Sequence, residues 1–316
     1  MNIIKNRYLY FLISLLVIIP GIFFMGLNWA QSKSSPLQLG IDFRGGSLLE
    51  LQFQGALPST ADIAALYKEF STDAQPIADP VIQSLGTDSV TIRSKAMTDE
   101  TKGKLVSEMG SRFGSKVIVL NFSSVSPSIG AEVTRAAALA ILLAALAIIG
   151  YIWWAFRSVE HAYRYGTAAI IAMLHDILVV LGVEAMLGHF LGWEADALFL
   201  TALLTVIGFS VHDTIVVFDR IRENSNIYRR LEYEKMVNHS IVQTLDRSIT
   251  TQLTVMFTLF SLVLFGGASI QHFVIILLVG IFSGTYSSIF NAAPILVVWE
   301  NREWTKWFKR KEETAI

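Results

Sequence analysis

The chain has 316 residues, of which 53% are hydrophobic and 16% are charged, and its formal net charge is −1. Soluble domains carry about 25% charged residues, so this composition indicates a large surface in contact with lipid. The small net charge gives no general attraction to nucleic acid, and we expect no nucleic-acid partner. The sequence contains no cysteine, which excludes disulfides, thiolate metal sites and cysteine nucleophiles.

The first apolar stretch covers residues 8–29 and predicts a membrane-spanning helix. About 20 apolar residues of helix cross a bilayer core of roughly 30 Å. This run is too long for the apolar region of a signal peptide, and no small-x-small cleavage pattern precedes Gln31. We therefore expect residues 1–29 to be an N-terminal transmembrane helix that is retained.

Residues 30–135 predict a small α+β domain outside the membrane. Strand patterns at 48–53, 80–85, 89–93 and 116–122 alternate with helical patterns at 60–70 and 98–113. Ser59 or Thr60 is a candidate N-cap of the first helix. The order β-α-β-β-α-β is typical of a ferredoxin-like fold, in which two helices cover one face of an antiparallel sheet.

Residues 136–300 predict a bundle of five further transmembrane helices. The apolar stretches lie at 136–156, 165–187, 197–218, 249–266 and 273–299. The charged stretch 219–236 keeps spaced apolar residues, which fits either a helix on the membrane surface or a solvated loop helix. Residues 301–316 form a basic tail. The predicted fold class is thus an all-α bundle of six transmembrane helices plus one extracytoplasmic α+β domain.

Lysine and arginine are distributed unevenly among the connections. They occur in the N-terminus, the second-to-third and fourth-to-fifth connections and the tail, whereas 188–194 and 267–272 contain neither. Positive charge marks the cytoplasmic side of short loops, and long domains translocate largely regardless of their charge. We expect both termini to be cytoplasmic and residues 30–135 to lie on the opposite side.

Ionisable residues inside the predicted spans are the candidate functional residues. Such groups are costly in lipid and often mark ion pathways. Asp213 precedes the charged residue Asp219 by six positions, about 9 Å of helix, and Asp176 lies nearer the bilayer centre. The long side chain of Arg247 can reach along its helix, so an Asp213–Arg247 pair is geometrically possible. The plainer readings are a capping or snorkelling role for Asp213 and a packing role for His212.

These residue types predict a proton-responsive site. A buried carboxylate changes its proton affinity when a neighbouring arginine approaches or withdraws. A charge crossing the membrane releases about 2.3 kcal/mol per 100 mV, enough to drive a domain motion. The sequence has no G-x-x-x-x-G-K-[ST] phosphate loop, and histidines on different helices lack a metal-ligand spacing. We expect no enzyme activity, no cofactor and no metal.

Four motifs carry a resemblance to a known family: GIDFRGG at 40–46, SPSIGAE at 126–132, HDIL at 175–178 and GFSVHDTIVVFDRIREN at 208–224. With the arrangement of one helix, an outside domain and five helices, they resemble the SecD/SecF family of bacterial protein-export proteins, within the RND-type superfamily, and its SecF branch in particular. The family commonly has Gly, Tyr and Asn where Ser126, Phe209 and His212 stand. The histidine places a titratable group beside Asp213 and is expected to shift the pH dependence.

The resemblance implies a multi-pass protein of the bacterial inner membrane that acts with SecD beside the SecYEG channel. It implies use of the proton gradient to promote late translocation of a preprotein. The family's proton pathway maps onto Asp213 and Arg247, with Asp176 and His212 as further candidates. Two alternatives remain: an RND-type permease for small molecules or lipids, and a structural scaffold of the translocase that conducts no protons.

Overall fold

The computed structural model describes residues 2–32, 35–55, 57–73, 76–85, 87–157 and 161–303. The chain divides into two compact units, one formed by Leu39–Leu139 and the other by Met1–Gln38 with Ala140–Ile316. The sequence placed the corresponding boundaries at residues 30 and 135. Each unit has its own core.

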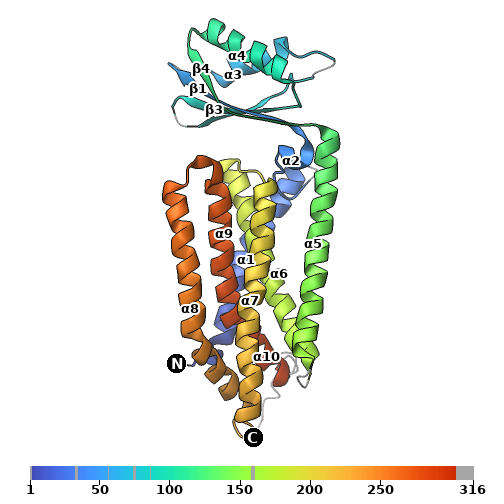
Figure 1. Cartoon of the computed structure of the whole chain (residues 1–316), viewed down its shortest axis with the longest axis vertical. Helices are drawn as coiled ribbons and strands as arrows, with labels where there is room; N and C mark the ends of the chain where they lie inside the picture. The colour runs from blue at the N-terminus through green and yellow to red at the C-terminus, as the bar shows by residue number, and fades with distance from the viewer. Residues whose placement is uncertain are drawn as a thin grey trace, which may run out of the picture. The chain divides into compact units, whose positions relative to one another are not determined.

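The unit Leu39–Leu139 contains an antiparallel four-stranded sheet (Figure 1). Its strands β1 (Gly46–Gln54), β2 (Val81–Leu85), β3 (Ser89–Ser94) and β4 (Lys116–Val125) lie in the order β2-β3-β1-β4. Helices α3 (Thr60–Glu69) and α4 (Asp99–Phe113) connect them. The predicted β-α-β-β-α-β order and ferredoxin-like topology are therefore confirmed.

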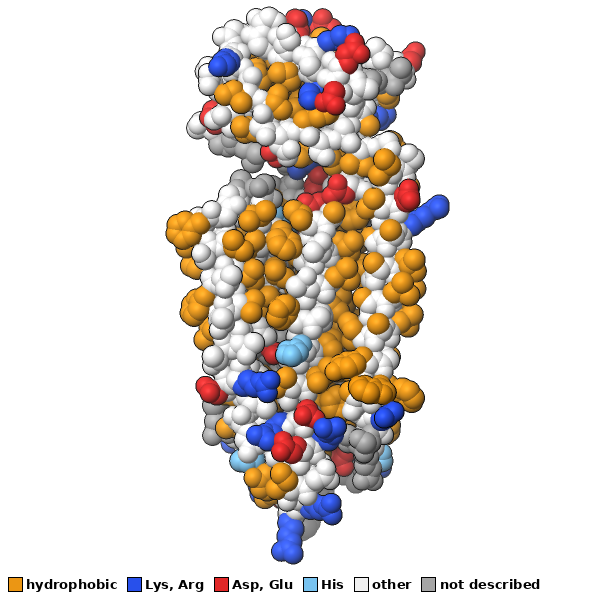
Figure 2. All heavy atoms as spheres, in the orientation of Figure 1, with side chains coloured by type: hydrophobic (Ala, Val, Ile, Leu, Met, Phe, Trp, Pro, Cys, Tyr) orange, Lys and Arg blue, Asp and Glu red, His pale blue; other side chains and the backbone are white. Residues whose placement is uncertain are grey.

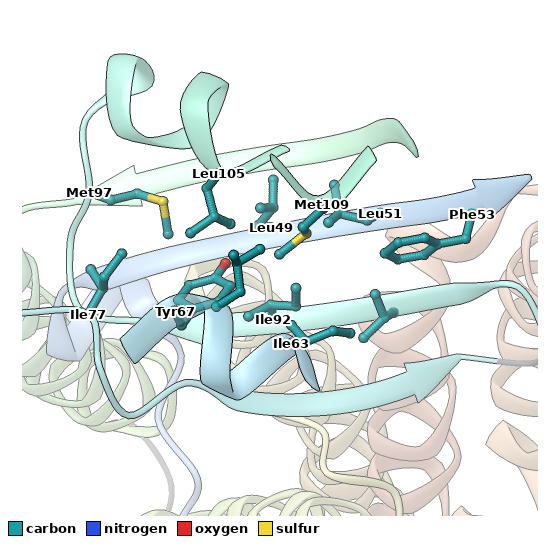
Figure 3. Packing of buried hydrophobic residues seen from close by; sticks show 12 residues of the cluster. Leu49, Leu51, Phe53, Ile63, Tyr67, Ile77, Ile92, Met97, Leu105 and Met109 are labelled. Carbon is teal, nitrogen blue, oxygen red and sulfur yellow. The ribbon is translucent and has the colours of Figure 1, made fainter. Parts of the chain in front are cut away.

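The core of this unit lies between the sheet and its two helices, as Figure 3 shows. Alternate residues of β1 point into it, because side chains of a strand alternate between its two faces. Those of β1 are Leu49, Leu51 and Phe53, and they meet Ile63, Tyr67, Leu105 and Met109 from the helices. Of the two N-cap candidates for α3, Ser59 is the one that accepts the Asp62 backbone N–H.

The motifs at 40–46 and 126–132 pack against each other within this unit. The short helix α2 (Ile41–Arg44) ends at Gly45, whose φ of 74° is left-handed. A Cβ on Gly45 would lie 2.7 Å from Pro127 Cα, and one on Gly130 would lie 2.6 Å from Gly45 N. Only glycine fits such close backbone contacts, so both motifs serve the junction where β1 begins and α5 starts.

The other unit contains a helix bundle, and the described part of the chain holds six stretches long and apolar enough to span a membrane. They are α1 (Arg7–Ser32), α5 (Pro127–Phe156), α6 (Ala162–Leu191), α7 (Ala197–Ile227), α8 (Tyr233–Phe265) and a last span composed of α9 (Ala268–Ser287), η2 (Ser288–Ala292) and α10 (Ala293–Glu300). At least half of the most apolar window is buried in α6, α7 and the last span, against 6–17% in α1, α5 and α8. The spans α6, α7 and α9–α10 therefore form the centre of the bundle.

The expectation for residues 219–236 was wrong. Instead of a separate surface or loop helix, α7 continues to Ile227 and α8 begins at Tyr233. Ile221 and Met236 are buried between the extended helix ends, whereas Ile227 and Leu231 are exposed. Helices do not have to end where the apolar sequence ends, because polar residues continue a helix beyond the lipid and pack against its neighbours.

Small residues allow the helices to approach closely. A Cβ on Gly280 would lie 2.1 Å from a Val206 methyl carbon, and one on Gly21 would lie 2.6 Å from Gly182 Cα. Gly280 and Gly284, a small-x-x-x-small pair, therefore let α9 approach α7 closely. The hydrophobic side chains on the visible face of the bundle (Figure 2) remain available for lipid.

The last span changes its helical hydrogen bonding in the middle. Residues Ser288–Ala292 form a single π-helical segment, directly before Pro294 in the first turn of α10. Proline has no N–H to donate to the preceding turn, so the ladder has to adjust there. Short π segments within α-helices are frequent at functional sites, and this one faces α6 and α7.

Candidate functional site

Asp213 lies near the middle of α7, and only 3% of it is exposed. Gln252 of α8, also 3% exposed, donates its side-chain amide to Asp213 Oδ2 at 2.7 Å. A neutral amide does not compensate the charge of a carboxylate buried at membrane depth. The hydrogen-bond partner of the Asp213 carboxyl in this structure is therefore a neutral group rather than a cation.

The expected ion pair between Asp213 and Arg247 is not formed in this structure. Arg247 is exposed on α8 and has no acidic partner in the described part of the chain. Gln252 lies five positions further along α8, which turns it about 140° around the helix from Arg247. The sequence analysis predicted a partner for Asp213 close to the correct level of α8. Arg247, however, lies on a different side of that helix from the residue that contacts Asp213, which is Gln252.

His212 points away from the buried face of α7. Its side chain is exposed, although the adjacent Asp213 is buried. Successive residues of a helix are separated by about 100°, so neighbours in sequence need not share a face. The structure therefore brings Asp213 together with Gln252 and does not place His212 in the same buried contact.

Asp176 of α6 is the most completely enclosed acidic residue of the predicted set, with 1% exposed. Ser210 of α7 and Ser287 of α9 each donate to its Oδ2 at 2.6 Å. Ser283 of α9 donates to Oδ1 at 2.7 Å, and His175 Nδ1 lies 3.0 Å from the same oxygen. One carboxylate thus ties together the three central helices of the bundle.

A chain of hydroxyl groups continues from this carboxylate along α7. A hydrogen bond of 2.8 Å joins the hydroxyls of Thr214 and Ser288, and both hydroxyls also lie within hydrogen-bonding distance of the Ser210 carbonyl oxygen. Ser288 is the first residue of the π segment η2. Ser210, which donates to Asp176, lies three positions from Asp213 on α7, so the two buried carboxylates lie within about one helical turn of each other. We call these two carboxylates and their hydroxyl and amide partners the buried polar layer.

Sequence reasoning found the carboxylates of this layer and missed its neutral partners. Those partners are Ser210, Thr214, Gln252, Ser283, Ser287 and Ser288. One usable signal was present, because Gly280, Ser283, Gly284 and Ser287 recur at spacings of three and four on one face of α9. That spacing favours close packing of α9, and it also supplies two hydroxyls to Asp176.

Other charged residues have local partners outside this layer. Glu184 is buried and lies 2.7 Å from His272 Nε2. Arg7 contacts Glu303 and Glu234 where the N-terminus meets the ends of the last span and α8. The described residues include no group of three or more His, Cys, Asp or Glu side chains arranged to hold a metal ion.

Comparison with known proteins gives consistent matches. The family model for the C-terminal part of the protein export membrane proteins SecD and SecF matches residues 105–302, and the SecD/SecF GG motif matches residues 34–56. Proteins named protein translocase subunit SecF from Anaerolinea thermophila and Thermobaculum terrenum are 54% and 47% identical. Those alignments cover 100% and 99% of this chain and 99% and 98% of theirs.

A solved structure shares the fold as well. SecDF from Thermus thermophilus, described as a translocon-associated membrane protein, matches with a TM-score of 0.77 and 31% identity. The match covers 96% of this chain and 39% of that one, so this chain corresponds to the smaller part of a longer protein.

The fold and the site define a multi-pass membrane protein with buried carboxylates in a six-span bundle and a small ferredoxin-like domain. The chain belongs to the SecD/SecF family of protein export membrane proteins.

Proposed function

We propose that this chain is an accessory, non-enzymatic subunit of the Sec protein-export machinery that acts with SecD beside the SecYEG channel. It uses the proton gradient to promote late translocation of preproteins across the bacterial inner membrane. The names of its relatives and its match to the smaller part of SecDF support the partnership with SecD. The distribution of Lys and Arg supports cytoplasmic termini.

The observation that carries the energy-coupling part is the burial of Asp213 beside a neutral amide. The carboxylate is 3% exposed, and its hydrogen bond comes from Gln252. Protonation of Asp213 removes a charge that this contact does not neutralise, which changes how α7 and α8 pack. In the proposal Asp176 and His212 have secondary roles in the proton pathway.

Arg247 enters the proposal as the cation that approaches Asp213 in a second arrangement of α7 and α8. In the present arrangement it is exposed and has no acidic partner among the described residues. It lies about 7.5 Å from Gln252 along the helix axis, a distance that an arginine side chain can span. Arg247→Gln is expected to lose gradient-driven export while leaving the Asp213–Gln252 contact intact.

The test uses inverted membrane vesicles that contain the full chain, SecD and SecYEG, with translocation of a preprotein measured with and without a proton gradient. Asp213→Asn is expected to lose the gradient-dependent part of translocation. Asp246→Asn, which changes an exposed carboxylate of α8, is the matched control and is expected to retain it. Full gradient-driven translocation by the Asp213→Asn protein would refute the mechanism.

Co-purification separates this mechanism from a scaffold role. An Asp213→Asn protein that still binds SecD but loses gradient dependence supports energy coupling. A variant that loses SecD while its residual export remains sensitive to the gradient supports a scaffold that conducts no protons.

A further inference from the structure

A second site lies away from the buried polar layer, where the end of α5 meets α7. A groove of about 520 Å³ opens there. Tyr151, Trp154 and Arg157 form its wall at the end of α5, and Ile215, Asp219 and Arg222 form its wall on α7. We call this feature the α5–α7 groove.

The charged groups of the α5–α7 groove do not cancel. Arg222 pairs with Asp219 at 2.5 Å. The guanidinium of Arg157 lies 5.6 Å from the centre of the Trp154 ring and has no acidic partner within the described residues. Among the described residues that line the groove, two arginines and one aspartate give a net charge of +1. Arg157, the arginine without an acidic partner among them, lies over the ring of Trp154.

The base of the groove is anchored, whereas its outer side is open. Phe156 is 2% exposed and packs on Tyr165 and Phe218, with ring centroids 5.5 Å and 6.0 Å apart. Between residues 140 and 156 of α5, only Ile152 and Phe156 are buried. The remaining side chains of this segment are exposed or half-buried, and the exposed Tyr151 and Trp154 line the groove on its outer side.

The aromatic residues place the groove at the boundary between lipid and water. Trp153 and Trp154 are 70% and 57% exposed, and Tyr151 precedes them on α5. Trp and Tyr gather at membrane interfaces because one end of each side chain is apolar and the other is polar. Arg157 follows these residues directly, and Asp219 and Arg222 of α7 line the groove at the same end of the bundle.

We propose that the α5–α7 groove binds an anionic phospholipid of the leaflet at this end of the bundle. The phosphate lies between Arg157 and Arg222, and the first acyl carbons run along Trp154 and Ile215. Basic pockets between transmembrane helices on the cytoplasmic side recognise such headgroups. The groove's net charge of +1 matches a lipid of net charge −1, such as phosphatidylglycerol, better than a zwitterionic lipid.

The test is native mass spectrometry of the full chain in detergent, incubated separately with phosphatidylglycerol, phosphatidylethanolamine and inorganic phosphate. Retained phosphatidylglycerol, weaker retention of phosphatidylethanolamine and no retained phosphate are the expected result. Equal retention of the two lipids would overturn the proposal. Retention of phosphate alone would also overturn it, because the groove would then be a site for free anions.

Two pairs of variants locate the binding. Arg157→Gln is expected to lower phosphatidylglycerol retention about fivefold, the effect of one arginine at an anionic surface. Arg230→Gln removes an exposed arginine that does not line the groove and is expected to have little effect. Trp154→Ala should reduce retention and Trp153→Ala should not, although both tryptophans are exposed. Equal retention within both pairs contradicts the site.

Discussion

Ser210 of α7 and Asp176 of α6 are joined by a hydrogen bond of 2.6 Å inside the helix bundle. Ser283 and Ser287 of α9 donate to the same carboxylate. A carboxylate surrounded by hydroxyl donors is solvated by the protein in place of water. The interior of this bundle is therefore organised around Asp176 as well as Asp213, and the two residues differ in their partners.

The serine cage of Asp176 should contribute measurably to stability. Ser287→Ala removes one of the short hydrogen bonds to the carboxylate and leaves that oxygen with fewer donors. We expect a loss of about 2 kcal/mol, as for hydrogen bonds to charged groups. Unfolding of the detergent-solubilised protein by heat or denaturant measures it. Ser261→Ala, at an exposed position of α8, should change little, and equal stability of the two variants would contradict the assigned role of the cage.

The fold was largely predictable because its signals are local. Leu49, Leu51 and Phe53 alternate in β1 as expected for a strand with one buried face, and the six spans are set by apolar length. The ends of α7 and α8 were missed. Their extensions are polar in composition and are held by tertiary burial of residues such as Ile221 and Met236, which a local pattern does not reveal.

The site was predictable only in part, for a different reason. Asp176 and Asp213 stand out because a carboxylate within an apolar run is costly. Gln252 and the serines do not stand out, because neutral polar residues are common in membrane helices and their role depends on which helix they face. The side of α8 that carries Arg247 was also beyond reach, since a small error in helix rotation exchanges a buried neighbour for an exposed one.

The contact between Arg7 and Glu303 should depend on pH. Burial alone raises the pKa of Glu303, but hydrogen bonds from Arg7, Tyr8 and Asn301 and the charge of Arg7 outweigh it, so the pKa lies below its ordinary value of 4.5. A carboxyl group whose pKa is lower in the folded than in the unfolded protein stabilises the fold at pH values above its unfolded-state pKa. That stabilisation is lost as the pH falls through the folded-state pKa. The contact is thus fully stabilising at neutral pH and weakens in acid.

Glu303→Gln tests whether the Arg7–Glu303 contact stabilises the fold at neutral pH and loses that effect in acid. At neutral pH the variant should be less stable than the parent by about 2 kcal/mol, the scale of a hydrogen bond to a charged group. The difference should shrink as pH falls below 4.5, which thermal unfolding at a series of pH values detects. Glu232→Gln, in an exposed pair with Lys235, should cost less than about 1 kcal/mol at any pH. A pH-independent difference for Glu303→Gln would rule out the assigned linkage.

The crossing of α1 and α6 depends on two facing glycines. A Cβ on Gly21 would lie 2.6 Å from Gly182 Cα, which neither backbone can accommodate without moving. Gly21→Ala should therefore separate the helices and lower the unfolding temperature of the detergent-solubilised protein. Gly26→Ala is the control on the same helix, because nothing lies within 4 Å of its Cβ position. Alanine favours a helix over glycine by about 1 kcal/mol, so without a clash neither substitution should lower the unfolding temperature. A Gly21→Ala protein as stable as the parent would therefore contradict the tight crossing.

Gly45 should be the most sensitive position of the motif at 40–46. Its φ of 74° disfavours any residue with a Cβ, and that Cβ would also lie 2.7 Å from Pro127 Cα. We expect Gly45→Ala to cost about 1–3 kcal/mol from backbone strain alone, with a further cost from the clash. Hydrogen exchange of the full chain should show faster exchange of β1 amides, because β1 begins beside this glycine. Gly103→Ala, in α4 with open space around its Cβ position, is the control and should leave the β1 amides protected. Unchanged protection of β1 in both variants would mean that the junction tolerates a side chain at Gly45. The glycine of the motif would then serve another purpose.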